Sequence, residues 1–153
     1  MLKNSFKAVI RWFQRATGLG RFQKGRFVSR EFVEDSLQNM IFQIRERTQS
    51  NRDVHGHPFV PYSPAYADWK KSTHVDLTLT GGMLDNLSYK IKFNRAIIYF
   101  SSAIEEEKAQ KLNYGSDEGY FILPSREFFG VTDPEIEFFI DSLSDVLHDK
   151  FKA

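Results

Sequence analysis

The sequence predicts a single α+β domain, with a small antiparallel β-sheet (a hairpin plus a further strand) packed by a long central helix and a C-terminal helix. Three observations lead to this prediction. Apolar residues recur at helical spacing over residues 29–49 and again after Asp133. Between these segments, apolar and polar residues alternate over 87–93, as in a half-buried strand. The length of 153 residues suits one domain with one core.

The first 17 residues predict a basic amphipathic helix. Their apolar residues stand three or four apart, and Trp12 widens the apolar face. Their basic residues recur every four positions and form a stripe: Lys3, Lys7, Arg11 and Arg15. Gly18 and Gly20 end the pattern. We therefore divide the chain into an N-terminal arm, residues 1–28, and a domain, residues 29–153. A helix of this kind can be a core helix, a docking arm or a helix on a membrane surface, and we favour a docking arm or edge helix because of Trp12.

The long central helix is predicted over residues 29–49, with Ser29 as a suitable N-cap. A loop rich in Gly and Pro follows over 51–73, pinned by aromatic residues that include Phe59 and Trp69. One or two helical turns can start at Pro64, because proline favours the first turn of a helix. Loops of this length in compact domains are usually functional or interface-forming.

The sheet is predicted from a hairpin and one later strand. The hairpin strands cover 87–93 and 96–101, around a turn at Asn94 and Arg95. A short helix is expected near 104–112, and the further strand near 120–123.

The last helix is expected to begin with Asp133 as N-cap and Pro134 as first helical residue. Its apolar residues recur at helical spacing through the rest of the chain. Phe138 lies off this stripe, so we interpret it as a contact to another subunit.

Charge is distributed unevenly along the chain, although the net charge is only +1. Residues 1–30 contain eight Lys or Arg and no acidic residue. Residues 101–153 contain five basic and twelve acidic residues. Such asymmetry is typical of a molecule with two unlike neighbours, or of one that stacks on its own copies. The alternative is a dipolar surface without a partner.

The sequence contains no strong motif for a catalytic, phosphate-binding or metal site. The chain has no Cys, no Gly-x-Ser-x-Gly motif and no phosphate-binding loop. Asp53, His55 and His57 resemble a metal site only loosely, since their spacing matches no established ligand pattern and polar turn residues explain them better. No apolar run approaches the roughly 20 residues that span a bilayer. We therefore expect no enzymatic activity, no cofactor, no metal and no membrane association.

Nucleic-acid binding is the alternative function. Basic residues interleaved with aromatic ones can grip phosphates. The residues concerned are Lys3, Lys7, Arg11, Arg15, Arg21, Lys24 and Arg26. The same stripe can equally meet an acidic protein surface, and the acidic residues of 101–153 on a neighbouring copy offer one.

Three motifs occur in a fixed order. They are DVHGHPFVPYS at 53–63, LTLTGGML at 77–84 and LPSREFFG at 123–130. The second is similar to a Leu-x-x-Thr-Gly-x-Leu pattern before a hairpin, and the third to an Ile-Pro-x-Arg-x-Phe-Leu-Gly pattern before a final helix. Together they resemble the virion morphogenesis, or tail-completion, family of tailed phages over about residues 30–150. Many members carry Trp at the position of Phe59.

The resemblance implies a non-enzymatic virion protein of the phage neck, at the head–tail junction, assembled in the host cytoplasm. It implies a homo-oligomeric ring, with a hexamer favoured, around the DNA channel. Partners would be other neck and tail proteins, such as head-completion and tail-tube proteins, with phage DNA nearby. The assembly contacts that we predict are Lys3, Lys7, Arg11, Trp12, Arg15, Phe59, Trp69, Thr80, Gly81, Arg126, Phe128, Phe129 and Phe138.

Overall fold

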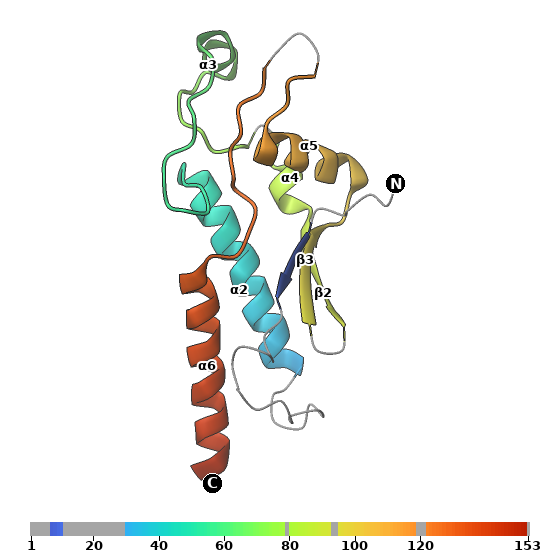
Figure 1. Cartoon of the computed structure of the whole chain (residues 1–153), viewed down its shortest axis with the longest axis vertical. Coiled ribbons are helices and arrows are strands. Elements are labelled where there is room, and N and C mark those ends of the chain that lie inside the picture. Colours follow the sequence, from blue (N-terminus) through green and yellow to red (C-terminus); the bar gives the residue numbers. More distant parts are fainter. Residues whose placement is uncertain (1–6, 11–29, 79, 93–94, 119–121, 153) are drawn as a thin grey trace.

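The computed structural model describes residues 7–10, 30–78, 80–92, 95–118 and 122–152 (Figure 1). The fold is α+β, as the sequence predicts. In chain order its elements are β1 (Lys7–Ile10), α2 (Arg30–Gln49), α3 (Pro64–Lys70), α4 (Gly82–Asp85), β2 (Leu87–Lys92), β3 (Arg95–Phe100), α5 (Ala103–Tyr114) and α6 (Asp133–Lys152).

The sheet is antiparallel and has the order β1-β3-β2. The predicted hairpin is confirmed, with Leu87 paired with Phe100 and Lys92 paired with Arg95. Arg95, expected in the turn, is the first residue of β3. On the other edge of β3, Lys7 pairs with Tyr99 and Ile10 with Ala96.

The predicted N-terminal helix is wrong at residues 7–10, which form strand β1. Val9 and Ile10 are β-branched and suit a strand, and β3 offers them an open edge with unpaired backbone groups. This long-range pairing overrides the local helical pattern. The other residues of the predicted helix, 1–6 and 11–17, lie outside the described residues. β1 is the third strand of the sheet. The strand predicted near 120–123 lies partly outside the described residues, which include only 122 and 123 of this segment, and there Leu123 forms an isolated bridge with Ser116.

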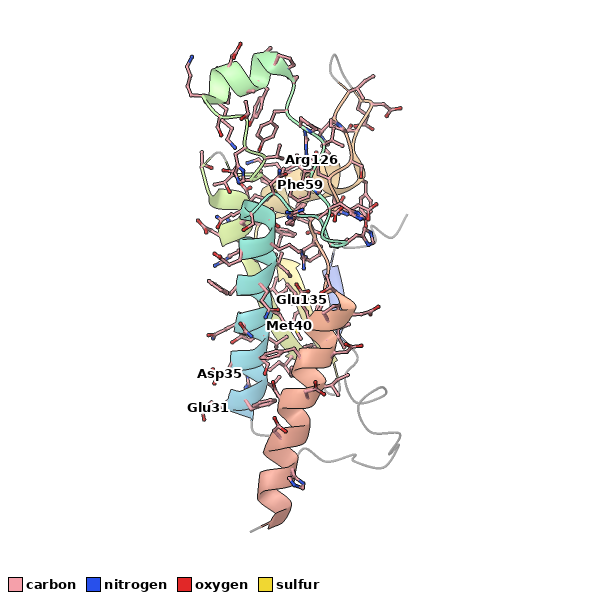
Figure 2. All side chains as sticks on the ribbon, turned by 90° about the vertical axis from the view of Figure 1, so that its left-hand side faces the viewer. Glu31, Asp35, Met40, Phe59, Arg126 and Glu135 are labelled. Carbon is pink, nitrogen blue, oxygen red and sulfur yellow. The ribbon has the colours of Figure 1, made fainter. Side chains whose placement is uncertain are left out.

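The core lies between one face of the sheet and α2. α2 buries one stripe of side chains, as predicted: Val33, Leu37, Met40, Ile41, Ile44 and Thr48. From the sheet, Ala96, Ile98 and Phe100 face this stripe within one apolar cluster. Figures 1 and 2 show α6 beside α2, and Phe139 of α6 packs on Phe32 of α2 with ring centroids 6.1 Å apart. The far end of α6 projects past α2 and the hairpin (Figure 1).

The start of α6 differs by one residue from the prediction. Thr132, not Asp133, is the N-cap, because the amide of Ile136 donates to the carbonyl of Thr132 at 3.0 Å. The Thr132 hydroxyl accepts from the amide of Glu135 at 3.3 Å, and a Glu135 carboxylate oxygen accepts from the amide of Thr132 at 2.7 Å. This reciprocal capping box fixes where the helix begins.

Other local predictions are confirmed. Ser63 caps α3, its hydroxyl accepting from the amide of Tyr66, and Pro64 is the first helical residue. The short helix predicted near 104–112 is α5, capped by Ser102. No helix in the described part of the chain is long and apolar enough to cross a membrane.

Candidate docking cleft

A cleft of about 1190 Å³ lies at the end of the molecule where α3, α4 and α5 meet. Residues 61–66 form one wall, and Leu77 with residues 80–83 forms another. α5 and residues 122–126 complete it. The lining is mainly apolar, with the charged exceptions Glu105, Lys108, Lys111 and Arg126. The volume of the cleft exceeds that of a typical small-ligand pocket, so the cleft suits a segment of another macromolecule.

Arg126 joins two of these walls. Its Nε donates to the carbonyl of Val60 at 2.9 Å, and its Nη2 donates to the carbonyl of Pro61 at 3.2 Å. Its guanidinium also lies over the Tyr62 ring, 5.2 Å from the centroid. The flat, forked shape of guanidinium makes this combination possible, and lysine cannot reproduce it. Arg126 thereby fastens the third motif to the first.

Arg126 is only 4% exposed. Among the described residues, no carboxylate forms an ion pair with it, and its partners are carbonyls and an aromatic ring. Burial therefore lowers the pKa of Arg126 below its ordinary value, although Tyr62 and Tyr66 offset part of this effect. A buried cation without a counter-ion is costly, so the site is suited to accept a carboxylate.

A second polar cluster holds α3 against the start of the second motif. Lys70 forms a short ion pair with Asp76, and its Nζ donates to the Tyr62 hydroxyl at 3.2 Å. The Tyr62 hydroxyl accepts from the amide of Leu77 at 3.2 Å, and Asp76 accepts from the amide of Thr78 at 3.0 Å. Leu77 has a φ of 51°, which is strained for a residue other than glycine. The cluster compensates for this strain.

The two charges of this cluster have opposite pKa shifts. Burial acts to lower the pKa of Lys70, but hydrogen bonds to Asp76 and Tyr62 outweigh it and raise the pKa above 10.5. Burial acts to raise the pKa of Asp76, but the hydrogen bonds from Lys70 and Thr78 outweigh it and lower the pKa below 3.8. Both shifts favour the charged forms.

The second motif turns sharply at Gly81, whose φ of 81° belongs to the left-handed region. Gly82 has no positive φ and begins the short helix α4. Glu105 lies next to Gly82 and forms an ion pair of 2.8 Å with Lys108. Lys111, which lines the cleft, forms an ion pair of 2.9 Å with Glu107, which lies outside the lining.

An aromatic row leads from the cleft onto the exposed side of α3. The rings of Tyr62 and Tyr66 are 4.8 Å apart in an edge-on arrangement, and those of Tyr66 and Trp69 are 5.5 Å apart. Trp69 is 63% exposed. Adjoining aromatic rings offer contact area with little conformational freedom to lose, which favours binding.

The residues predicted for assembly fall into four groups. Phe59 and Phe128 are buried in the core of their own chain, and Phe129 packs against Phe100 with centroids 5.1 Å apart. Thr80, Gly81 and Arg126 line the cleft, while Trp69 and Phe138 are exposed. Lys7 is in β1, and the remaining basic and aromatic candidates, from Lys3 to Arg26, lie outside the described residues.

The candidate metal residues form a turn. One Asp53 carboxylate oxygen accepts the amides of His55 and His57, each at 2.8 Å. His55 contacts Glu127 at 3.3 Å through its ring. In the segments that the structure describes, no group of three or more His, Asp or Glu is arranged to hold a metal ion.

Sequence reasoning missed the cleft and the Lys70–Asp76 pair. The three motifs carried a partial signal, since each contributes residues to the cleft, but nothing in their spacing places them side by side. Comparisons of this chain with protein-family models, with curated proteins and with solved structures find no match.

Proposed function

We propose that this chain is a non-enzymatic structural protein of the tailed-phage neck, which assembles with its own copies into a ring that completes the tail and joins it to the head. The observation that carries the proposal is the convergence of three motifs on one cleft. These motifs, at 53–63, 77–84 and 123–130, are the ones that resemble the tail-completion family. Their shared location supports a common role in assembly.

Two further observations support the proposal. The basic residues of 1–30 and the acidic residues of 101–153 give one chain two complementary surfaces for stacking. Large apolar side chains are also exposed on several elements, including Phe42, Trp69 and Phe138. Aromatic residues such as these are enriched at protein–protein interfaces.

The test is the composition of purified phage particles. Mass spectrometry of virions freed of host protein should detect this chain at a copy number consistent with one ring. A phage that lacks the gene should yield separate heads and tails, and the supplied protein should restore joined particles. Absence of the chain from mature virions, together with normal joining in its absence, would contradict the proposal.

The second candidate is a nucleic-acid-binding module, favoured by the eight basic residues and no acidic residue in 1–30. Deleting 1–28 is an unsuitable test, because it removes strand β1 from the sheet. The better variant replaces Arg11, Arg15, Arg21, Lys24 and Arg26 by Gln. Retention on DNA that weakens with salt and disappears in this variant would favour the module. Equal behaviour of both proteins at low salt would eliminate it.

A further inference from the structure

Two surfaces of the molecule combine charged and exposed apolar side chains in a way that suits binding to another protein. One is the cleft described above. The other is the exposed face of α6, which we call the α6 ridge and define as Glu137, Phe138, Asp141 and Asp145. The cleft belongs to the end of the molecule that carries α3, α4 and α5, and α6 extends toward the opposite end (Figure 1).

The lining of the cleft has three basic residues and one acidic residue. Arg126 is buried without a carboxylate partner in the described chain, whereas Lys108 and Lys111 on α5 already pair with Glu105 and Glu107. Glu105 is the single acidic residue of the lining, and it is paired with Lys108. The rest of the lining is mainly apolar, and Ile122 at its border is 85% exposed. The cleft therefore suits an occupant that combines an apolar side chain with carboxylates.

The α6 ridge has this composition. Phe138 is 58% exposed, and Glu137, Asp141 and Asp145 are exposed beside it. Residues 133–147 include five acidic and no basic residues. Among the described residues, Glu135 forms the only ion pair of this stretch, and it faces Arg47 on α2. Among the residues that the structure describes, the ridge therefore carries carboxylates without an ion-pair partner around an exposed aromatic ring.

We propose that the cleft of one copy receives the α6 ridge of the next copy, with Phe138 against the apolar walls. The carboxylates of Glu137 and Asp141 then face the positive cleft, where Arg126 gains a counter-charge. Because the two surfaces are different and do not overlap, the contact is heterologous, and repeating it produces a ring or an open filament. This inference rests on the proposed ring assembly and specifies the contact that builds it.

Disulfide trapping tests the contact directly, since the chain has no Cys of its own. One full-length variant carries Ile122→Cys at the cleft border, and a second carries Asp145→Cys on the ridge, which keeps Phe138 in place. The control is Phe42→Cys on α2, because Phe42 is 58% exposed but belongs to neither surface.

Mild oxidation of an equimolar mixture should give a disulfide-linked dimer between the cleft and ridge variants. The yield should exceed that of either variant mixed with the Phe42→Cys control by about tenfold, because the specific contact raises the effective concentration of the two thiols. A chain carrying both changes should give a ladder of linked species. Equal yields in all mixtures would overturn the proposal.

Charge exchange gives an independent test. Asp141→Lys and Lys111→Glu, made separately, should each weaken self-association by about tenfold, as judged by sedimentation velocity. The two changes combined in one chain should restore association to within about threefold of the natural chain, because the contact again pairs opposite charges. A double variant that associates no better than either single variant would contradict the proposed attraction between the ridge and the cleft.

The two proposals fail in different ways. If the chain is present in virions but the cleft and ridge do not cross-link, the contact is wrong and the neck function stands. If the two surfaces cross-link but the chain is absent from virions, the contact stands and the neck function is wrong.

Discussion

This molecule has two regions, and each is stabilised by a different kind of interaction. The helix–sheet body, comprising α2, the three strands and the first half of α6, is stabilised by apolar side chains that face one another across a shared core. The loop end, residues 50–81 and 115–131, has few regular elements. Its backbone is held largely by polar side chains that reach across to it.

The loop end shows this pattern repeatedly. Arg47 donates to the carbonyls of Phe128 and Gly130, at 3.1 and 3.0 Å. Asn113 accepts from the amide of Phe129 at 3.0 Å, and Asn51 accepts from the amide of Phe59 at 3.1 Å. Irregular backbone must find hydrogen-bond partners when it is packed inward, and here side chains supply them. We infer that the stability of the loop end depends on these polar side chains, whereas the stability of the body depends on apolar burial.

The largest effect should come from a cavity in the body. Ile98 is fully buried in β3, so Ile98→Ala should lower the free energy of unfolding by about 3–4 kcal/mol. The matched control, Ile104→Ala, removes an exposed side chain and should change it by less than about 0.5 kcal/mol. Urea unfolding followed by circular dichroism measures both. Similar losses in the two variants would show that apolar burial does not distinguish the body.

The next effect should come from the link between the two regions. Arg47 pairs with Glu135 and holds two loop carbonyls, so Arg47→Ala should cost about 3 kcal/mol. Hydrogen exchange should accelerate most at the amides of 126–132. Arg45→Ala removes two hydrogen bonds, to the carbonyls of Leu84 and Asp85, but no ion pair among the described residues, so it should cost about 1 kcal/mol. An equal or larger cost for the Arg45 variant would contradict this ranking.

A smaller effect is expected from backbone conformation in the loop end. A Cβ on Gly115 would approach the carbonyl oxygen of Leu123 to 2.8 Å, and φ is 77° there. Gly115→Ala should therefore destabilise by about 2 kcal/mol. Gly56 has a similar φ of 83° but open space around it, so Gly56→Ala should cost about 1 kcal/mol. Thermal unfolding separates the two, and a larger loss for Gly56→Ala would show that contact with the 123–125 segment is unimportant.

The smallest effect should be the pH dependence of the Lys70–Asp76 pair. Because the pKa of Asp76 is lowered from 3.8, its stabilisation is present above that value and is lost as the pH falls through the folded pKa. Because the pKa of Lys70 is raised from 10.5, its stabilisation is present below that value and is lost as the pH rises through the folded pKa. The pair should therefore contribute about 1 kcal/mol between these limits.

Asp76→Asn tests this pH dependence, because it keeps the side-chain shape and removes the charge. The difference in stability between the natural chain and this variant should be largest near neutral pH and should shrink below pH 4. Urea titrations at several pH values measure it. A difference that stays constant down to pH 2 would mean that the carboxylate charge plays no part.

Regular elements of the fold were predictable because their signals are local. The apolar stripe of α2 repeats with the period of a helix, and β2 alternates with the period of a strand. Pro64 marked the start of α3. Each of these patterns depends on residues within a few positions of one another, so the sequence alone was sufficient.

The candidate site was predictable only in part. Thr80, Gly81 and Arg126 were selected from the motifs, and all three line the cleft. The Lys70–Asp76 pair was missed although only six residues separate its members, because no periodic pattern brings the end of α3 against the loop that follows it. The cleft was missed because no sequence pattern links residues 61–66 to α5 and residues 122–126. Phe59 and Phe128 were selected as contacts but are core residues, since a motif does not reveal which side of the backbone faces the core.

The sequence by itself determined the α+β class, the helices α2 and α6, the hairpin and the uneven distribution of charge. Only the tertiary structure decided that residues 7–10 form a strand, since their apolar spacing fits either a helix or a strand and the free edge of β3 made the choice. It also decided that Arg126 bonds to carbonyls 65 and 66 positions away. Periodicity fixes local conformation, whereas pairing between distant segments depends on which surfaces the whole chain brings together.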